Sequence, residues 1–506
     1  CNLFGYWRIR STGNCNGRAI NDIEKIVSVF NFLKDLFEKI GNEQSGGMSL
    51  ANFDNELSEI FSKLNVRYEN YKDIFSAIIR DLIIWCNDNH TRMGQTSYYI
   101  TFNIGLAKDD FGKFLAETLI DEFYKLGDLV YKPNIVFKVK SGINLEENTK
   151  NFSIFKKALL CSAKKMIPTY LLCDSKTNSK YNPLFLSVVG CRTRVVENIY
   201  GESTSVGRGN IANISINLPR LAFEIKKEIK FNSENNNNFF ELLKKKWLYV
   251  AENCKDILLD RFNKICNSDV NLFPTNKSIN LWIKPFDNLY DVFKNGTLSI
   301  GFIGLSECFE ILTGKKFWKD SETYFEALKF VSFMRKVLDS YKNTTKLNFS
   351  LLATSGELIS GRFLEIDKNI YPEYEFIFSK GYYTNSFHVD VDSHIAAYKK
   401  IKLEGPFHYL SNGGCITYIE LKEAPIGNYL GLIDLIKIAI ESGTHYMGIN
   451  FHKDFCSDCE NSGIFTNCSS CGSENIIRIR RVSGYLEIEN YFTKGKMNES
   501  KNRKGN

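Results

Sequence analysis

Along the chain, segments in which apolar residues have the spacing of a helix alternate with segments in which they have the spacing of a strand. Between Asn21 and Gly41, apolar residues recur every three or four positions, which predicts an amphipathic helix. The same criteria predict three further helices and two strands, over residues 57–86, 110–125 and 152–166 and over residues 97–103 and 134–140. This repeated alternation indicates an α/β architecture with parallel sheet.

Three other segments differ in composition from this pattern. Residues 232–238 are polar and rich in asparagine, which predicts a surface loop. Residues 497–506 are charged and end the chain, so we expect them to fray. The most apolar helix candidate, residues 429–440, still contains Asp434 and Lys437, and no run reaches the roughly 18 apolar residues needed to span a bilayer.

The composition allows a large core and favours a reducing compartment. The chain has 506 residues, of which 43% are hydrophobic, and its net charge of +7 is small for that length. Such a charge permits a polyphosphate substrate but does not argue for nucleic acid or a membrane as partner. Fourteen cysteines without a secretory signal indicate the cytoplasm and metal or redox chemistry. Because the sequence opens on Cys1 instead of Met, we expect it to lack an N-terminal part.

Two Cys-x-x-Cys pairs near the end of the chain predict a metal site. They are Cys456 with Cys459 and Cys468 with Cys471. Pairs at this spacing put four thiolates on two tight turns, the arrangement that tetrahedral Zn²⁺ requires. A closed site of this kind is usually structural, so a zinc ribbon that merely holds the end of the chain is the simplest interpretation.

Two further motifs gain meaning only in combination. Gly484 lies in the segment Arg-Val-Ser-Gly-Tyr after a strand expected over residues 476–482, and by itself it is typical of a turn. Cys191 lies in Val-Val-Gly-Cys-Arg-Thr-Arg, and by itself it is typical of a buried structural cysteine.

Together these motifs resemble one enzyme family. The two cysteine pairs, the run Arg-Arg-Val-Ser-Gly-Tyr-Leu and residues 492–496 resemble the end of the anaerobic (class III, glycyl-radical) ribonucleotide reductases. The segment around Cys191, followed by residues 207–210 and 216–220, is similar to the finger loop of that family. The matching segments follow one another in the family's order along nearly the whole chain.

The resemblance implies a particular fold. It is a ten-stranded α/β barrel of two parallel half-sheets, with a finger loop through its centre, followed by a zinc ribbon and a glycyl-radical loop. We therefore expect residues 1–445 to form the catalytic barrel, incomplete at its N-terminus, and residues 446–506 to form the zinc-binding and glycyl-radical domain.

The resemblance also implies roles for four residues. Gly484 would store a backbone radical, because a glycine α-carbon can become planar and share the unpaired electron with its flanking amides. Cys191 would become the thiyl radical, since its S–H bond is weak enough to exchange hydrogen with that glycyl radical. Cys1 would return a hydrogen atom to the substrate radical, and Asn210 would lie beside formate, the external reductant, as an uncharged donor to its carboxylate.

The implied activity is the reduction of ribonucleoside triphosphates to 2′-deoxyribonucleoside triphosphates. A radical S-adenosylmethionine enzyme would activate the protein, which would act as a homodimer under control by ATP and deoxyribonucleotides. Val189 stands where formate-using members carry Met, so formate and a dithiol protein both stay open as the reductant. Other segments match the family without an assigned role, namely residues 44–47 and 92–95, which could bind phosphate, residues 353–357, and His388.

Two other functions compete with the reductase. The first is a nucleic-acid-binding zinc-ribbon protein with a basic tail, formed by Lys494, Lys496, Lys501, Arg503 and Lys504. The second is a different glycyl-radical enzyme, such as an acyltransferase or a lyase, although those lack the four-cysteine site. The cysteines outside the named motifs show no metal spacing and are expected to pack in the core.

Overall fold

The computed structural model describes residues 21–88, 98–232, 238–279, 281–283, 288–481 and 484–505. Cys1 and residues 92–95, both singled out above, lie outside this part of the chain. The α-helices are α2 (Asp22–Gly41), α3 (Phe53–Lys63), α4 (Lys72–Asn87), α5 (Asp110–Lys125), α6 (Phe152–Lys165), α7 (Leu218–Asn232), α8 (Phe239–Cys266), α9 (Pro274–Ile279), α10 (Leu289–Phe293), α11 (Leu305–Thr313), α12 (Ser321–Thr345), α13 (Ile359–Ile370), α14 (Glu375–Phe378), α15 (Ala397–Leu410), α16 (Tyr429–Glu441) and α17 (Lys494–Asn502).

Two sheets with mainly parallel strands form the body of the protein. The larger has the order β1 (Met48–Leu50), β2 (Ile100–Ile104), β3 (Asn134–Val139), β4 (Thr169–Leu172), β9 (Tyr446–Asn450) and β8 (Thr417–Glu420). The smaller has the order β5 (Asn210–Asn217), β6 (Thr297–Ile303) and β7 (Asn348–Ala353). Every pair is parallel except β4 with β9, which is antiparallel. The predicted α/β class is therefore confirmed, with one antiparallel junction in the larger sheet.

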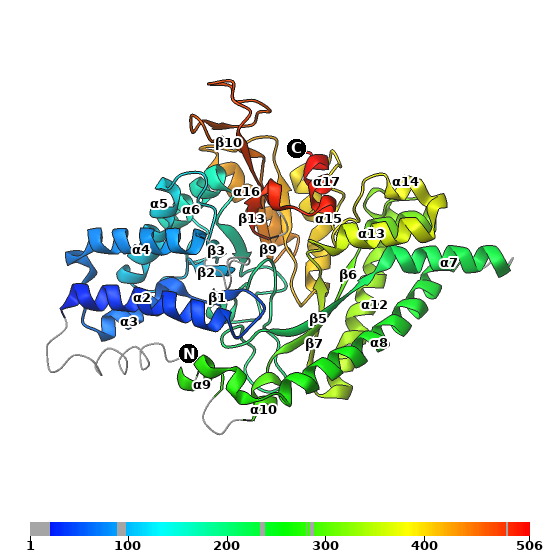
Figure 1. Ribbon diagram of the computed structural model, residues 1–506, viewed down its shortest axis with the longest axis horizontal. Coiled ribbons are helices and arrows are strands. Elements are labelled where there is room, and N and C mark those ends of the chain that lie inside the picture. The colour runs from blue at the N-terminus through cyan, green and yellow to red at the C-terminus, as the bar shows by residue number, and fades with distance from the viewer. Residues whose placement is uncertain are drawn as a thin grey trace.

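Each sheet has its own hydrophobic core and its own set of helices. Helices α2 to α6 gather beside the larger sheet, and α7, α8 and α12 lie along the smaller one (Figure 1). The strands between them, such as β3 and β7, are buried along their whole length, as expected for parallel strands covered by helices. Among the described residues, no helix combines the length and apolarity that crossing a bilayer requires.

Local sequence signals explain where several helices begin and end. The Asn21 side chain accepts a hydrogen bond from Glu24 N, and the Glu24 side chain accepts one from Asn21 N, so a capping box starts α2. The helix predicted over residues 57–86 was wrong in one respect, because the chain forms two helices there, α3 and α4. The break follows from Asn65, which takes a left-handed backbone conformation (φ +57°) after α3, a conformation that Asn tolerates better than most residues.

The segment between β4 and β5 runs between the two sheets. Ser49 Oγ on β1 donates a hydrogen bond to Val188 O at 3.0 Å. On the other side, Ile199 N donates to Asn348 Oδ1 on β7 at 3.1 Å. One loop thus contacts the first strand of the larger sheet and the last strand of the smaller sheet.

The end of the chain forms a separate antiparallel sheet that projects from the body. Its order is β11 (Ser462–Gly463), β10 (Lys453–Cys456), β12 (Ile476–Arg481) and β13 (Leu486–Ile488), and β10 lies at the top of the view in Figure 1. Strand β9, at the start of the segment expected to form the C-terminal domain, pairs with β4 and β8 in the larger sheet of the body.

The expectation that residues 497–506 fray was wrong for the part that the structure describes, which ends at residue 505. Residues 497–502 belong to α17, and Lys496 and Glu499 are buried and paired at 2.5 Å. Arg503 reaches Glu499 at 2.7 Å and Glu420 on β8 at 2.8 Å. Charges are normally solvated at a chain end, but here each buried charge has a partner of opposite sign, so the helix docks on the body.

Candidate active site and metal centre

Cys191 lies at the tip of the loop between the two sheets. Val189 N donates a hydrogen bond to Thr193 O at 3.1 Å, and these two residues form an isolated antiparallel bridge. Gly190 takes a left-handed conformation (φ +59°) that closes the turn. The bridge presents Cys191, whose side chain is partly exposed, at the end of a narrow hairpin.

Gly484 packs directly against the backbone of Cys191. A Cβ atom added at Gly484 would lie 2.2 Å from Cys191 Cα and 2.3 Å from Cys191 O. No side chain fits at that distance, so this close approach requires glycine. The structure thus brings together two of the residues that the sequence singled out.

Glu357 and Tyr485 complete the surroundings of Cys191. The Cys191 thiol donates to Glu357 Oε1 at 3.4 Å, and the Tyr485 hydroxyl donates to Glu357 Oε2 at 2.6 Å. Glu357 lies between β7 and α13, in a segment that matches the family but to which the sequence assigns no role. Since these residues are far apart in the sequence, no local spacing could have assigned this contact.

Burial keeps Tyr485 protonated. Its ring packs against that of Tyr99, with centroids 4.4 Å apart. Burial raises the pKa of Tyr485, and the neighbouring Cys191 and Glu357 raise it further. Tyr485 is therefore a hydrogen-bond donor to Glu357 at any physiological pH.

The opposite flank of the hairpin rests on a buried polar chain that begins at Arg192. Its Nη1 lies 3.4 Å from His388 Nε2, and His388 Nδ1 lies 3.1 Å from Glu404 Oε2. Burial lowers the pKa of His388 even though Glu404 opposes the shift, which leaves a neutral ring that accepts from Arg192 and donates to Glu404. His388, for which a core role and a functional role were both open, is thus a buried partner of the residue after Cys191.

The remaining two predicted site residues are not placed in this centre. Asn210 opens β5, and its Oδ1 accepts a hydrogen bond from Ser299 Oγ on β6 at 2.9 Å. That contact lies within the smaller sheet, so the predicted role of Asn210 stays a prediction. Cys1 lies outside the described residues, so its predicted position is not tested.

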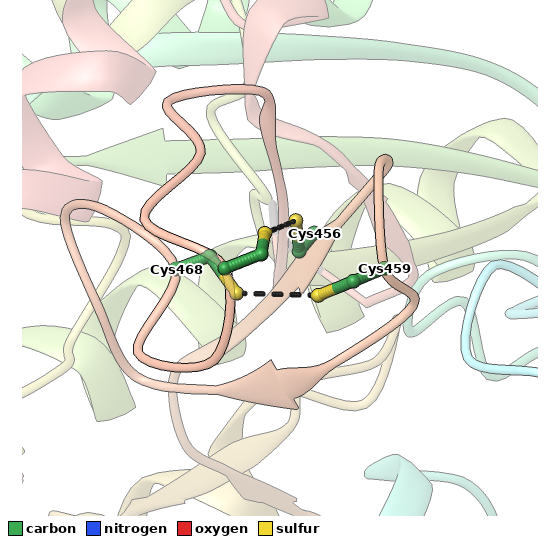
Figure 2. A group of neighbouring side chains, drawn as sticks. Cys456, Cys459 and Cys468 are labelled. Carbon is green, nitrogen blue, oxygen red and sulfur yellow. Dashed lines mark hydrogen bonds between the residues drawn. The ribbon is translucent and has the colours of Figure 1, made fainter.

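The four predicted metal ligands do converge. The sulfur atoms of Cys456, Cys459, Cys468 and Cys471 all lie within 4.8 Å of one another. Cys456 Sγ is 3.7 Å from Cys471 Sγ, and Cys459 Sγ is 3.4 Å from Cys468 Sγ (Figure 2). Sulfur atoms about 2.3 Å from one tetrahedral Zn²⁺ would be separated by slightly under 4 Å, so these residues fit that ion.

Each cysteine pair sits on the same kind of turn. Glu460 N donates to Cys456 O at 2.9 Å, and Gly472 N donates to Cys468 O at 2.8 Å. Both Glu460 and Gly472 have positive φ, at +61° and +76°. Two matching knuckles therefore present the thiolates to one point, as the spacing predicted.

A second group of metal-capable side chains is buried between α15, β8 and β9. It comprises His408, Cys415 and His445, and the two Nδ1 atoms lie 3.2 Å apart. His408 Nε2 also lies 2.9 Å from Thr417 Oγ1. Burial lowers the pKa of His408 to about 3, so it is neutral and both of its ring nitrogens are hydrogen-bonded. Cys415 was expected only to pack in the core, and it does so beside this histidine pair.

Only part of the predicted basic tail is exposed and could contact nucleic acid. Two of its five cations, Lys496 and Arg503, have side chains only 2% and 6% exposed and are paired with Glu499 and Glu420. What remains is three scattered lysines, which do not make a continuous basic surface.

Comparison with known proteins identifies relatives across most of the chain. A family model described as anaerobic ribonucleoside-triphosphate reductase matches residues 11–505. The chain is 31% identical over 437 residues to the anaerobic ribonucleoside-triphosphate reductase of Salmonella typhimurium, covering 82% of this chain and 60% of that protein. It is 27% identical over 528 residues to the protein of the same name from Enterobacteria phage T4, covering 96% of this chain and 84% of that protein. The chain thus spans about 60% of the length of the bacterial relative.

The fold is similar to that of a solved structure. The anaerobic ribonucleotide reductase of Thermotoga maritima, determined in complex with dATP and CTP, superposes with a TM-score of 0.67 at 14% identity. This superposition covers 93% of the present chain and 76% of that one. At such low identity the likeness concerns the fold alone.

Proposed function

The chain belongs to the family of anaerobic ribonucleoside-triphosphate reductases, and on this premise we propose that it reduces ribonucleoside triphosphates to 2′-deoxyribonucleoside triphosphates by radical chemistry. The observation that carries the proposal is the contact between Gly484 and Cys191. A stored radical and a thiol can exchange hydrogen only when their atoms are neighbours. Gly484 and Cys191 are so close that even the methyl group of an alanine at position 484 would not fit.

The first step is the transfer of a hydrogen atom within the protein. An activating enzyme that uses S-adenosylmethionine removes one hydrogen atom from the α-carbon of Gly484. The glycyl radical then takes the hydrogen of the Cys191 S–H bond, so a C–H bond forms, the S–H bond breaks and the unpaired electron moves to sulfur. Glu357 accepts a hydrogen bond from that thiol and fixes its orientation.

The second stage takes place on the ribose. The Cys191 thiyl removes the hydrogen at C3′, the 2′-hydroxyl leaves as water after gaining a proton, and Cys1 supplies a hydrogen atom to C2′. Formate, which becomes CO₂, or a dithiol, which becomes a disulfide, provides the two electrons. Return of the hydrogen to C3′ regenerates the thiyl. Positioning and the exclusion of water are the protein's main contributions, because the radical does the bond-breaking.

The proposed reductant is either formate or a dithiol protein. Asn210, the residue expected beside formate, lies at the start of β5 and bonds to Ser299. Val189 occupies the position of the methionine in formate-using relatives, which favours testing both donors.

The cysteine ribbon has a structural part in this proposal. Four Cys thiolates close the coordination of Zn²⁺ and leave no open position for chemistry. Bound there by Cys456, Cys459, Cys468 and Cys471, the ion would hold the two knuckles together at the far end of β10 and β12. Strand β12 runs from this cluster to Arg481, three residues before Gly484, so the ribbon supports the glycine loop.

The remaining assignments follow from family membership. We propose that the six and three strands described in the two sheets belong to a ten-stranded barrel, with the loop that carries Cys191 as its finger. We further propose a homodimer in the cytoplasm, with ATP and deoxyribonucleotides as effectors. The Thermotoga reductase was determined in complex with dATP and CTP, which supports nucleotide effectors and substrates for this chain as well.

The decisive experiment observes the radical without altering the protein. The chain is incubated anaerobically with a radical S-adenosylmethionine activating enzyme and a reductant, once in unlabelled form and once with glycine deuterated at the α-carbon. The proposal expects a doublet in the electron paramagnetic resonance spectrum of the unlabelled protein that collapses to a singlet on deuteration. Oxygen should then cleave the chain at Gly484. A silent spectrum from protein that contains full zinc would contradict the proposal.

Deuteration is preferable to the Gly484→Ala variant as the primary test. A Cβ at Gly484 would collide with Cys191, so the alanine variant removes the radical site and also displaces the thiol. Deuterated glycine changes only the hydrogen that splits the signal.

A further inference from the structure

The side chain of Arg481 reaches back from β12 to the carbonyl of Gly484. Its Nη1 donates to Gly484 O at 3.1 Å. Its Nη2 donates to Met166 O, just before β4, and to Ile449 O on β9 at 3.3 Å. One guanidinium therefore joins the glycine loop to the C-terminal end of α6 and to β9 of the larger sheet.

This cation is buried, and no carboxylate among the described residues pairs with it. Arg481 is 2% exposed, and none of the ion pairs formed by the described residues includes it. Burial lowers its pKa, with the Tyr418 ring, 5.3 Å away, opposing the shift, but a guanidinium still keeps its charge. Its positive charge is therefore directed at backbone carbonyl oxygens.

Arg480 shows that this arrangement is specific to Arg481. Arg480 is also buried, but it forms an ion pair with Asp454 on β10 at 2.6 Å and donates to Lys453 O at 2.8 Å. Those contacts stay within the small C-terminal sheet. Of two adjacent arginines, one closes the ribbon and the other contacts the glycine itself.

We propose that Arg481 is a positioning residue that stabilises the radical form of Gly484, an inference that rests on the function proposed above. In a glycyl radical the unpaired electron is shared among the α-carbon, the amide nitrogen and the carbonyl group. A charged donor on the carbonyl oxygen favours this sharing by drawing electron density toward oxygen. The same hydrogen bond fixes the plane of the Gly484–Tyr485 peptide, and with it the direction of the α-carbon toward Cys191.

The balance of the hydrogen transfer explains why this bond matters. The radical is either on Gly484 with Cys191 as a thiol, or on Cys191 with Gly484 as ordinary glycine. A donor that stabilises only the first state keeps the radical stored on Gly484 between turnovers. A charge-assisted hydrogen bond contributes enough to change such a balance about tenfold.

The variants Arg481→Gln and Arg481→Lys test the proposal, with Arg480→Lys as the matched control. Each is activated anaerobically, and the splitting, the g values and the lifetime of the glycyl signal are measured at high field. We expect Arg481→Gln to change the splitting and shorten the lifetime on the order of tenfold. Arg481→Lys, which restores a charge but not the fork, should be intermediate, and Arg480→Lys should match the parent.

A measurement on the parent protein covers the case in which Arg481→Gln does not fold, as judged by zinc content and circular dichroism. Parent protein labelled with ¹⁵N in its arginine guanidinium groups should show a weak ¹⁵N coupling to the radical in electron–nuclear double resonance. Absence of that coupling, or a folded Arg481→Gln variant with the parent's splitting and lifetime, would overturn the inference. Absence of any radical in the parent would instead overturn the proposed function.

Discussion

The cysteine ribbon and the Cys191–Gly484 centre both depend on cysteine and glycine, but they are assembled over very different lengths of chain. All four ligands of the ribbon lie within residues 456–471, on two turns of the same kind. The other centre joins residue 191 to residue 484, with Glu357 from a third segment. The ribbon is encoded by local spacing, whereas the centre exists only once both sheets are in place.

This difference predicts how a substitution in one region should affect the other. We expect the cores of the two sheets to remain when the ribbon loses its metal, because its four cysteines lie on two local turns outside those cores. The centre instead depends on elements from the whole molecule, including β12, which links it to the ribbon. We therefore expect substitutions in the ribbon to disturb the Cys191–Gly484 centre more than substitutions in that centre disturb the ribbon.

The largest expected effect is a loss of nucleotide reduction in a variant that still stores the glycyl radical. Cys191→Ser should abolish nucleotide reduction to background, because an O–H bond is too strong to give hydrogen to a glycyl radical. The glycyl signal and the zinc content should stay at the parent level, since Gly484 and the ribbon are intact. Product analysis and electron paramagnetic resonance on one sample check this, and residual turnover by the serine variant would refute the role of Cys191.

The next effect tests the link from the ribbon to the centre. Cys468→Ser should lose the metal and lower stability by several kcal/mol, on the scale of structural zinc sites. The yield of glycyl radical should fall with it, because β12 loses its anchor. Zinc per chain, melting temperature and radical per chain are measured together. Cys266→Ser, at a partly buried cysteine outside the cluster, is the control and should retain full zinc.

A smaller effect concerns the docked tail. Glu499→Gln should destabilise the protein by about 3–5 kcal/mol, because it removes the carboxylate shared by Lys496 and Arg503 and leaves buried charge uncompensated. Denaturant unfolding measures the change. Glu365→Gln, which removes a surface pairing with Lys494 at 3.9 Å, should cost less than about 1 kcal/mol. Equal effects would show that the tail is not docked.

The smallest effect is a pH dependence that arises in the body. The pKa of His408 is about 3 in the folded protein but about 6.5 when exposed, so the unfolded chain takes up the proton first as pH falls. The folded protein is most stable with respect to this group above pH 6.5, and stability is lost progressively as the pH falls toward 3. The loss at pH 5 is about 2 kcal/mol.

His408→Gln should therefore show a smaller fall in melting temperature between about pH 7.5 and about pH 5 than the parent. His394→Gln, at an exposed histidine, serves as the control and should follow the parent curve. If His408→Gln has the parent's pH dependence, His408 is not the group that titrates on unfolding.

Much of the fold was accessible from the sequence, because its signals are local. The helices predicted over residues 110–125 and from Asn21 to Gly41 follow from apolar spacing, and the structure has both. The single helix over residues 57–86 and the frayed tail were wrong. Each failure came from a contact or conformation that composition does not encode, namely the turn at Asn65 and the pairing of Lys496, Glu499 and Arg503.

The residues of the candidate site also fall into two groups, those that local spacing identifies and those that only tertiary contacts identify. The four metal ligands could be named together from spacing alone, because a metal knuckle needs only a few neighbouring residues. Cys191 and Gly484 could be named only singly, and by resemblance. Glu357 and the back-bond from Arg481 to Gly484 O were not assigned, because a charged residue in a strand or turn gives no sign of its distant partner.

The sequence by itself determined most of the predicted helices and strands, the cysteine knuckles and the family, since each depends on residues close together or on a matching order of motifs. Only the tertiary structure decided that Gly484 lies against Cys191, that Glu357 receives both the thiol and the tyrosine hydroxyl, and that Arg481 points at the glycine carbonyl. The physical reason is that these contacts join segments whose approach depends on how the two sheets and the C-terminal ribbon pack together, and packing is a property of the whole chain.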